Sequence, residues 1–403
     1  MDAELSPEQD EIRRTLRDLL AKHCTSDALR AAADSPAGHD PELWSRLTAL
    51  GLPGLLQPAE LGGLDLTPVD LAVVAEETGR ALLPAPLLGG WLAASALTEA
   101  AAPALTAPAL TTPAVTVPAS AEAASARARL ASGAATGALC LAETVAALPA
   151  APASAGGGRA GGLQARPAPE GPEGGWLLYG EAPTVLDGAA ADLLVVTAHT
   201  GGYPRSRSVL LLVDGGAPGV RRTRLPALDD TRSLARVEFR DAPAALLADP
   251  APDPAAGTAA LAAVAVAAQA VGAARESLGR AVEHARTREQ FGRPIGANQA
   301  LAHALADVHV AVQSARATVL HAAWSLSVAE PDPTDPALAL AAALDAQTLA
   351  AGTAIQVHGG LGITWEHDAQ LFYKRAAADE LLFGPAHALR ARAADAAGLL
   401  ADL

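Results

Sequence analysis

The sequence predicts a mainly α-helical protein with a central β domain: an N-terminal helical domain, a middle β-barrel or sandwich, and a C-terminal four-helix bundle. Half of the 403 residues are hydrophobic but only 3% are aromatic, so Ala and Leu, both strong helix formers, supply most of the apolar content. Short apolar runs separated by Gly, Pro and Asp appear in the middle of the chain, where they indicate strands. The expected domains are 1–120, 121–250 and 251–403.

The first domain is predicted to be a set of helices joined by turns. Ser6 followed by Pro7 is typical of a helix start, and apolar residues then recur at helical spacing. A later stretch rich in Pro, Ala and Thr resembles a linker. The expected segments are further helices over 41–50, 68–82, 88–97 and 121–130, a turn-rich connector over 55–66 and the linker over 101–120.

The middle of the chain reads as strands, and the remainder reads as long helices joined by short turns, which together form an antiparallel bundle. A stretch rich in Gly, Ala and Pro, 149–175, is expected to be a long surface loop. The expected strands are 137–141, 176–179, 193–197, 209–213 and 235–239. The expected helices of the bundle are 258–286, 299–329, 336–352 and a last one running from 368 to 403.

Composition and charge exclude several classes of function. A formal net charge of −15 argues against nucleic acid as a partner. Cys24 and Cys140 fit neither a metal site nor a disulfide framework, which indicates a reducing, cytoplasmic location. The acidic N-terminus lacks the basic start of a signal peptide. The apolar run 255–274 is mostly alanine, so no membrane span is expected.

The histidines are expected to be structural. His303 and His358 lie in Ala-rich helical segments and are expected to be hydrogen-bonded interior or interface histidines. His367 has no second ligand nearby in the sequence, so no metal is expected.

A turn over 286–299 gathers guanidinium groups in an otherwise acidic chain. Planar guanidinium groups chelate phosphate oxygens two at a time, and glycine and proline in the turn leave backbone N–H groups free. This combination suits a nucleotide pyrophosphate; the alternative is a plain arginine-rich turn between helices. The side chains concerned are Arg286, Arg288, Gln290, Phe291, Arg293 and Gln299.

The order of elements and four motifs resemble the acyl-CoA dehydrogenase family over nearly the whole chain. The motifs are Pro58-x-x-x-Gly62-Gly63, the pair Glu76-Glu77, Arg288-Glu-Gln-Phe-Gly-Arg-Pro-Ile-Gly followed by Gln299, and Gln356-Val-His-Gly-Gly-Leu-Gly. The resemblance implies FAD, an acyl-thioester substrate and a dimer or dimer of dimers. It also implies α,β-desaturation, in which a carboxylate removes the α proton while the β hydride passes to the flavin.

The chain departs from the family pattern where the catalytic glutamate is expected. One class of the family places it at a position that falls here on Phe383 or Gly384, and the other class at a position that falls on Ala262. The nearest carboxylates, Asp379 and Glu380, are expected to face solvent or to pair with Lys374 or Arg375. In the β domain, the segments 141–144 and 184–188 lack the hydroxyl and the aromatic wall that hold a subunit's own flavin, and Glu143 is not expected to be catalytic.

The residues that family members send across the dimer interface to the neighbour's FAD are kept. The chain is therefore expected to be the non-catalytic subunit of a heteromeric enzyme, resembling two-subunit actinobacterial enzymes that act on bulky sterol- or polyketide-like thioesters. Its partners would be a homologous subunit, in a heterodimer or heterotetramer, and an electron-transfer flavoprotein or similar acceptor. Two alternatives stay open: a homomeric FAD enzyme with non-standard chemistry, and a flavin-free scaffold. The expected FAD contacts are Arg288, Gln290, Phe291, Gln299, Gln356, Gly359 and Gly360.

Overall fold

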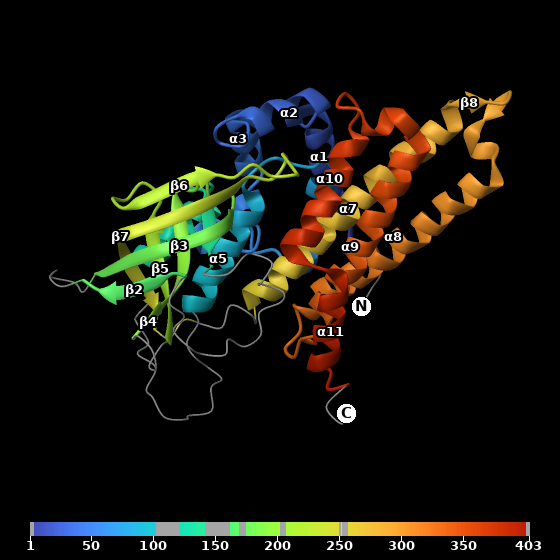
Figure 1. The fold of residues 1–403 in the computed structure, drawn as a ribbon. Coiled ribbons are helices and arrows are strands. Elements are labelled where there is room, and N and C mark those ends of the chain that lie inside the picture. Colours follow the sequence, from blue (N-terminus) through green and yellow to red (C-terminus); the bar gives the residue numbers. More distant parts are fainter. Residues whose placement is uncertain are drawn as a thin grey trace.

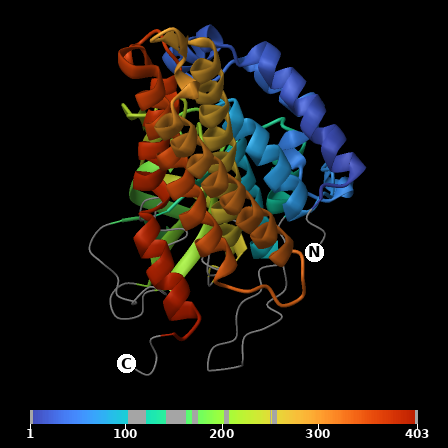
Figure 2. The ribbon, with the colours of Figure 1, turned by 90° about the vertical axis from the view of Figure 1, so that its right-hand side faces the viewer.

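A β-barrel and a helical bundle lie side by side, with the N-terminal helices packed between and above them (Figure 1). Figure 2 shows the bundle in front, the barrel behind it, and the first helix along one flank. This computed structural model describes residues 4–101, 121–141, 162–168, 175–201, 207–249, 251 and 257–399. The predicted linker from residue 102 on, most of the predicted loop, and Glu143 lie outside these ranges. The two expected domain boundaries also fall there and stay predictions.

The N-terminal helices begin where the sequence provides caps. The Ser6 hydroxyl accepts a hydrogen bond from the backbone N–H of Gln9, and the Ser6 backbone N–H donates to Gln9 Oε1, which closes a capping box at the first helix. Thr67 does the same with Asp70 at the fourth. A short second helix, capped by Thr25, was not predicted. The helices are α1 Pro7–His23, α2 Ser26–Asp34, α3 Pro41–Ala49, α4 Pro68–Arg80, α5 Leu87–Ala101 and α6 Ala121–Ala131, with 3-10 turns η1 Leu52–Gly54 and η2 Ala59–Leu61.

Seven strands form the central β-barrel. The ring β4–β2–β3–β7–β5 closes because β5 returns to pair with β4, and β1 and β6 attach to β4 and β7. Only the β1–β4 and β2–β4 pairs are parallel. The strands are β1 Gly137–Cys140, β2 Gln164–Pro167, β3 Trp176–Leu186, β4 Leu193–Thr200, β5 Arg207–Asp214, β6 Val220–Arg224 and β7 Leu234–Ala248. The prediction missed β6, and β2 lies inside the expected loop.

Alanine and glycine allow the helices of the bundle to pack closely. The central helix α7, Gly257–Thr287, is buried along most of its length. A Cβ at Gly272 would lie 1.9 Å from the carbonyl oxygen of Glu76, and one at Gly79 would lie 2.0 Å from that of Gln269. The backbones of α4 and α7 are therefore in direct contact, which only glycine permits.

The remaining helices of the bundle are α8 Gln299–Ser325, α9 Asp335–His358, α10 Ala369–Phe383 and α11 Ala386–Ala396. The single last helix expected over 368–403 is wrong, because the chain breaks at Gly384-Pro385 into α10 and α11. Two helical stretches are long and apolar enough to cross a membrane, but 89% of the apolar window of α7 and 56% of that in 335–363 are buried inside the protein. We therefore assign α7 to the core.

Candidate functional site

The arginine turn is a small hairpin at the tip of α7 and α8, at the end of the bundle remote from the barrel (Figure 1). Its strands are β8 Glu289–Gln290 and β9 Arg293–Pro294. The hairpin is anchored at its base, where the Ile295 N–H donates to the carbonyl of Arg288 at 2.8 Å. Phe291 sits at the turn with φ of 52° and a side chain that is 99% exposed. The aromatic side chain at the tip of the hairpin is therefore fully open to solvent.

The other predicted residues of this turn are also exposed. Within the described ranges, no hydrogen bond or ion pair engages the guanidinium groups of Arg286, Arg288 and Arg293. Glutamines 290 and 299 present their amides beside them. The hairpin therefore offers unpaired cationic and amide donors, a set that fits the oxygens of a diphosphate.

The second motif lies at the same end of the bundle. Gln356 is exposed in the last turn of α9, and the chain continues into the 3-10 turn η5, Gly359–Ile363. Gly359 has φ of 62°, and a Cβ at Gly359 or Gly360 would meet no atom within 4 Å. The glycines thus leave an open surface on which a ligand or partner can approach the backbone.

Three imidazoles join the two motifs. The rings of His284 in α7 and His358 in α9 have centroids 4.5 Å apart, and His367 lies on the other side of His358 at 4.5 Å. His358 is hydrogen-bonded as expected, through Nδ1 to the carbonyl of Ala354 at 2.7 Å. His303 is exposed on α8. No group of residues suited to hold a metal occurs in the part of the chain that the structure describes.

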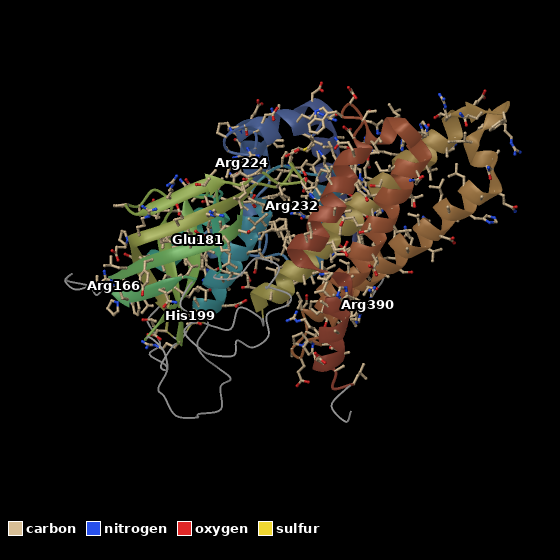
Figure 3. The ribbon with its side chains drawn as sticks, in the orientation of Figure 1. Arg166, Glu181, His199, Arg224, Arg232 and Arg390 are labelled. Atoms are coloured by element: carbon tan, nitrogen blue, oxygen red, sulfur yellow. The ribbon has the colours of Figure 1, made fainter. Side chains whose placement is uncertain are left out.

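The positions where the resemblance places the family's glutamate hold no acid, and two of the three are buried. Phe383 ends α10 with a side chain that is 1% exposed, Gly384 follows it, and Ala262 is 1% exposed in α7. The prediction for Asp379 was wrong. This carboxylate is fully buried and accepts a hydrogen bond from Arg232 Nε at 3.0 Å, because the loop before β7 brings Arg232 against α10 (Figure 3).

A buried polar network connects the barrel to the bundle through Arg232. The second guanidinium nitrogen of Arg232 donates to Gln269 Oε1 at 2.9 Å, and Gln347 donates to Asp379 at 3.1 Å. The guanidinium lies 5.6 Å from the ring centroid of Phe383, as a cation–π contact. Guanidinium, carboxylate and aromatic ring therefore fill the space next to the expected base positions.

The pair Arg375–Asp229 extends this network toward the barrel. Arg375 donates to the carboxylate of Asp229 and to the hydroxyl of Thr231. Burial works to raise the pKa of Asp229, but Arg375 and Arg232 outweigh it and hold that pKa below its usual range. Asp229 therefore stays ionised inside the protein, where both arginines compensate its charge.

The segment 184–188, which the family uses to hold a subunit's own flavin, borders the same region. Burial raises the pKa of Asp187 to about 7, although the carboxylate accepts the Gly89 N–H at 3.1 Å. The cavity between Asp187, Arg232 and Ser233 has a volume of about 20 Å³. That volume holds about one water molecule.

The sequence contains little that predicts this network. Asp229, Arg232 and Asp379 lie far apart along the chain, and none belongs to a motif. One signal was available: the polar run Asp229-Asp-Thr-Arg232-Ser233 stands between apolar segments. A polar run of this kind is usually exposed, and only the fold shows that it is buried.

The sequence of this chain is similar to known proteins over nearly its whole length. Residues 6–111 match the family model "Acyl-CoA dehydrogenase, N-terminal domain", and residues 255–398 match "Acyl-CoA dehydrogenase, C-terminal domain". The chain is 36% identical over 387 residues to the acyl-CoA dehydrogenase IpdE2 of Mycobacterium tuberculosis, with 95% of each chain covered.

Two solved structures of two-protein complexes share the fold. The ChsE4–ChsE5 complex from Mycobacterium tuberculosis matches with a TM-score of 0.78 and 26% identity, covering 98% of this chain and 99% of the other. A variant of the Tcur3481–Tcur3483 steroid acyl-CoA dehydrogenase matches with a TM-score of 0.77, 25% identity and the same coverage.

Proposed function

Because this chain belongs to the acyl-CoA dehydrogenase family, FAD-dependent oxidoreductases acting on CH–CH donors, we propose that it is the subunit of a heteromeric enzyme that supplies FAD contacts but no catalytic base. A homologous partner subunit supplies the carboxylate that removes the α proton of an acyl thioester. The proposal assigns to each chain one half of a shared site.

The observation that carries the proposal is the filled space around Arg232. Desaturation needs a carboxylate close to the α carbon and a flavin against the β carbon. Here the carboxylate of Asp379 is bound by Arg232 and Gln347, and Phe383 stacks under the guanidinium. A carboxylate engaged in this way is not available as a base.

The hairpin and the glycine turn support the second half of the proposal. Bound FAD supplies a hydride acceptor. In this chain Arg288 would contact its phosphates, the glutamines 290, 299 and 356 would donate amide hydrogen bonds, Phe291 would cover an apolar edge, and the backbone at Gly359 and Gly360 would lie against it. All of these groups are exposed and point away from the protein's own interior. They therefore fit a ligand held mainly by another chain.

The comparisons support a heteromer. The chain resembles proteins whose solved structures are two-protein complexes, one of them described as a steroid acyl-CoA dehydrogenase. By analogy the substrate proposed here is a bulky acyl-CoA thioester, and the electron acceptor an electron-transfer flavoprotein or similar protein.

Co-expression with a homologous acyl-CoA dehydrogenase subunit tests the proposal. The expected result is a complex with about one FAD for every two chains, and a colourless protein when this chain is purified alone. Charged hydrogen bonds contribute about 1.5–3 kcal/mol, so Arg288→Ala in the complex should weaken FAD binding about 10- to 150-fold.

Arg166→Ala is the matched control, because Arg166 pairs with Asp241 on the exposed barrel surface and should leave FAD binding unchanged. One FAD per chain in the isolated protein would refute the proposal. Unchanged flavin content after Arg288→Ala would favour the flavin-free scaffold instead.

A further inference from the structure

The three stacked histidines are a feature that the proposed function does not use. They come from three separate elements: His284 from the end of α7, His358 from the end of α9, and His367 from the segment before α10. Neighbouring ring planes are inclined by 32° and 50°. The stack is the direct side-chain contact between the base of the hairpin and the glycine turn η5.

Hydrogen bonds require His367 to be unprotonated at one nitrogen. The Ala369 N–H donates to His367 Nδ1 at 3.1 Å, so this nitrogen must carry a lone pair. Ala369 is the first residue of α10, whose N-terminal N–H groups have no partner within the helix. Asp368 occupies the cap position but makes no capping bond. The imidazole of His367 therefore does the capping.

Charged side chains from α2, α7 and the segment before α10 lie near the stack. Asp368 is held by Ser26 and Arg30 from α2 and by Arg280 from α7. Arg288 directly follows the end of α7, and its backbone N–H donates to the carbonyl of His284 at 2.9 Å. Asp368 is the acid whose charge acts on His367. Arg30 and Arg280 bind Asp368, and Arg288 acts on His284. A proton added to the stack thus meets mainly cations.

The direction of the titration agrees with this arrangement. Burial, followed by His358 and Arg288, lowers the pKa of His284. Burial, followed by His358, also lowers the pKa of His367, although Asp368 opposes this. His284 lies in the last turn of a helix, where the dipole favours a cation, so burial and neighbouring groups outweigh the dipole here.

We propose that the stack of His284, His358 and His367 is a pH-sensitive clasp, which holds the glycine turn against α7 and caps α10 only while its imidazoles are uncharged. Because the folded state binds protons less readily than a free histidine, the clasp is fully closed above about pH 6.5 and opens as pH falls below it. That the clasp orders the FAD contacts rests on the proposed function. That the clasp opens as pH falls does not.

Hydrogen exchange of this chain alone tests the clasp. Amide protection of Gly359, Thr364 and Ala369, corrected for intrinsic rates, should fall about tenfold or more from about pH 7.5 to about pH 5.5, since two like charges at ring contact repel strongly. His358→Phe keeps a flat ring between His284 and His367 that cannot carry a charge, so protection at Gly359 and Thr364 should change less than about twofold, while protection of Ala369 still depends on His367. His358→Ala should lose protection at both pH values.

His303→Phe, on the exposed face of α8, is the control and should behave as the wild type. Equal loss of protection in the wild type and His358→Phe would overturn the clasp, as would protection that does not change with pH in the wild type.

The co-expressed complex supplies a second readout at neutral pH. His358→Ala should weaken FAD binding about tenfold, and His358→Phe should restore it to within about twofold of the wild type. A complex that binds no FAD would refute the proposed function while the exchange result on the isolated chain still decides the clasp. A complex that binds FAD equally well with all three residues at 358 would overturn the ordering role.

Discussion

Replacing Arg232 by Ala should destabilise the protein more than any surface change, because it leaves a buried carboxylate without its cation. Asp379 is fully buried, and after the substitution it keeps only the amide of Gln347. Removing one partner of a buried ion pair costs about 3–5 kcal/mol. The loss of the contact with Phe383 adds to this cost.

The expected change in melting temperature follows from chain length. Unfolding entropy is about 2.1 cal/mol/K per residue, or about 0.85 kcal/mol/K for this chain, so the loss lowers Tm by about 4–6 °C. Thermal unfolding followed by circular dichroism measures it.

The matched control is Arg390→Ala (Figure 3). Arg390 pairs with Asp345, but these side chains are 49% and 55% exposed, and such pairs contribute about 1 kcal/mol or less. Its Tm should stay within about 1 °C of the wild type. If Arg232→Ala and Arg390→Ala have the same Tm, the buried network does not hold the barrel to the bundle, and the reasoning fails.

Three further predictions concern groups that are buried or half-buried. Burial raises the pKa of Asp187 from 3.8 to about 7, so its ionised form destabilises the fold as pH rises through that window. Relative to the wild type, Asp187→Asn should gain stability progressively over this range, reaching roughly 4 kcal/mol above pH 7, and a gain that is independent of pH in urea titrations would contradict this. Phe383→Glu should give no acyl-CoA oxidation by the isolated chain, because the new carboxylate pairs with Arg232; turnover with an artificial electron acceptor would contradict the filled site. Burial raises the pKa of Cys24 to about 12, so mass spectrometry should find it unalkylated by iodoacetamide at about pH 8 under native conditions, and modified after denaturation.

Periodicity and capping residues were enough to predict most of the helices. The sequence failed where a local signal was weak or was misread. Helix α2 is only nine residues long and follows α1 after two residues, so it was not separated from its neighbour. Strand β6 reads Val-Arg-Arg-Thr-Arg, an edge strand with charged side chains and no apolar alternation. The break between α10 and α11 was visible as Gly384-Pro385 and was overlooked.

The candidate site also has one part that the sequence predicts and one part that it does not. The hairpin could be predicted because its arginines and glycines are contiguous in the chain, and their composition alone indicates an anion site. The network around Arg232 could not, because its members come from the loop before β7, α7, α9 and α10. Only the packing of these elements brings them together, and no period or spacing encodes it.

The protruding hairpin also decides how this polypeptide fares when it is made in excess. Arg286 and Arg288, both exposed where α7 meets the hairpin, are targets for trypsin-like proteases, which cleave after basic residues in accessible segments, whereas Arg293 precedes Pro294 and resists them. A docked companion would shield those bonds. Surplus copies would then be trimmed and assembled ones spared, so that the tip makes the chain's survival depend on its stoichiometry.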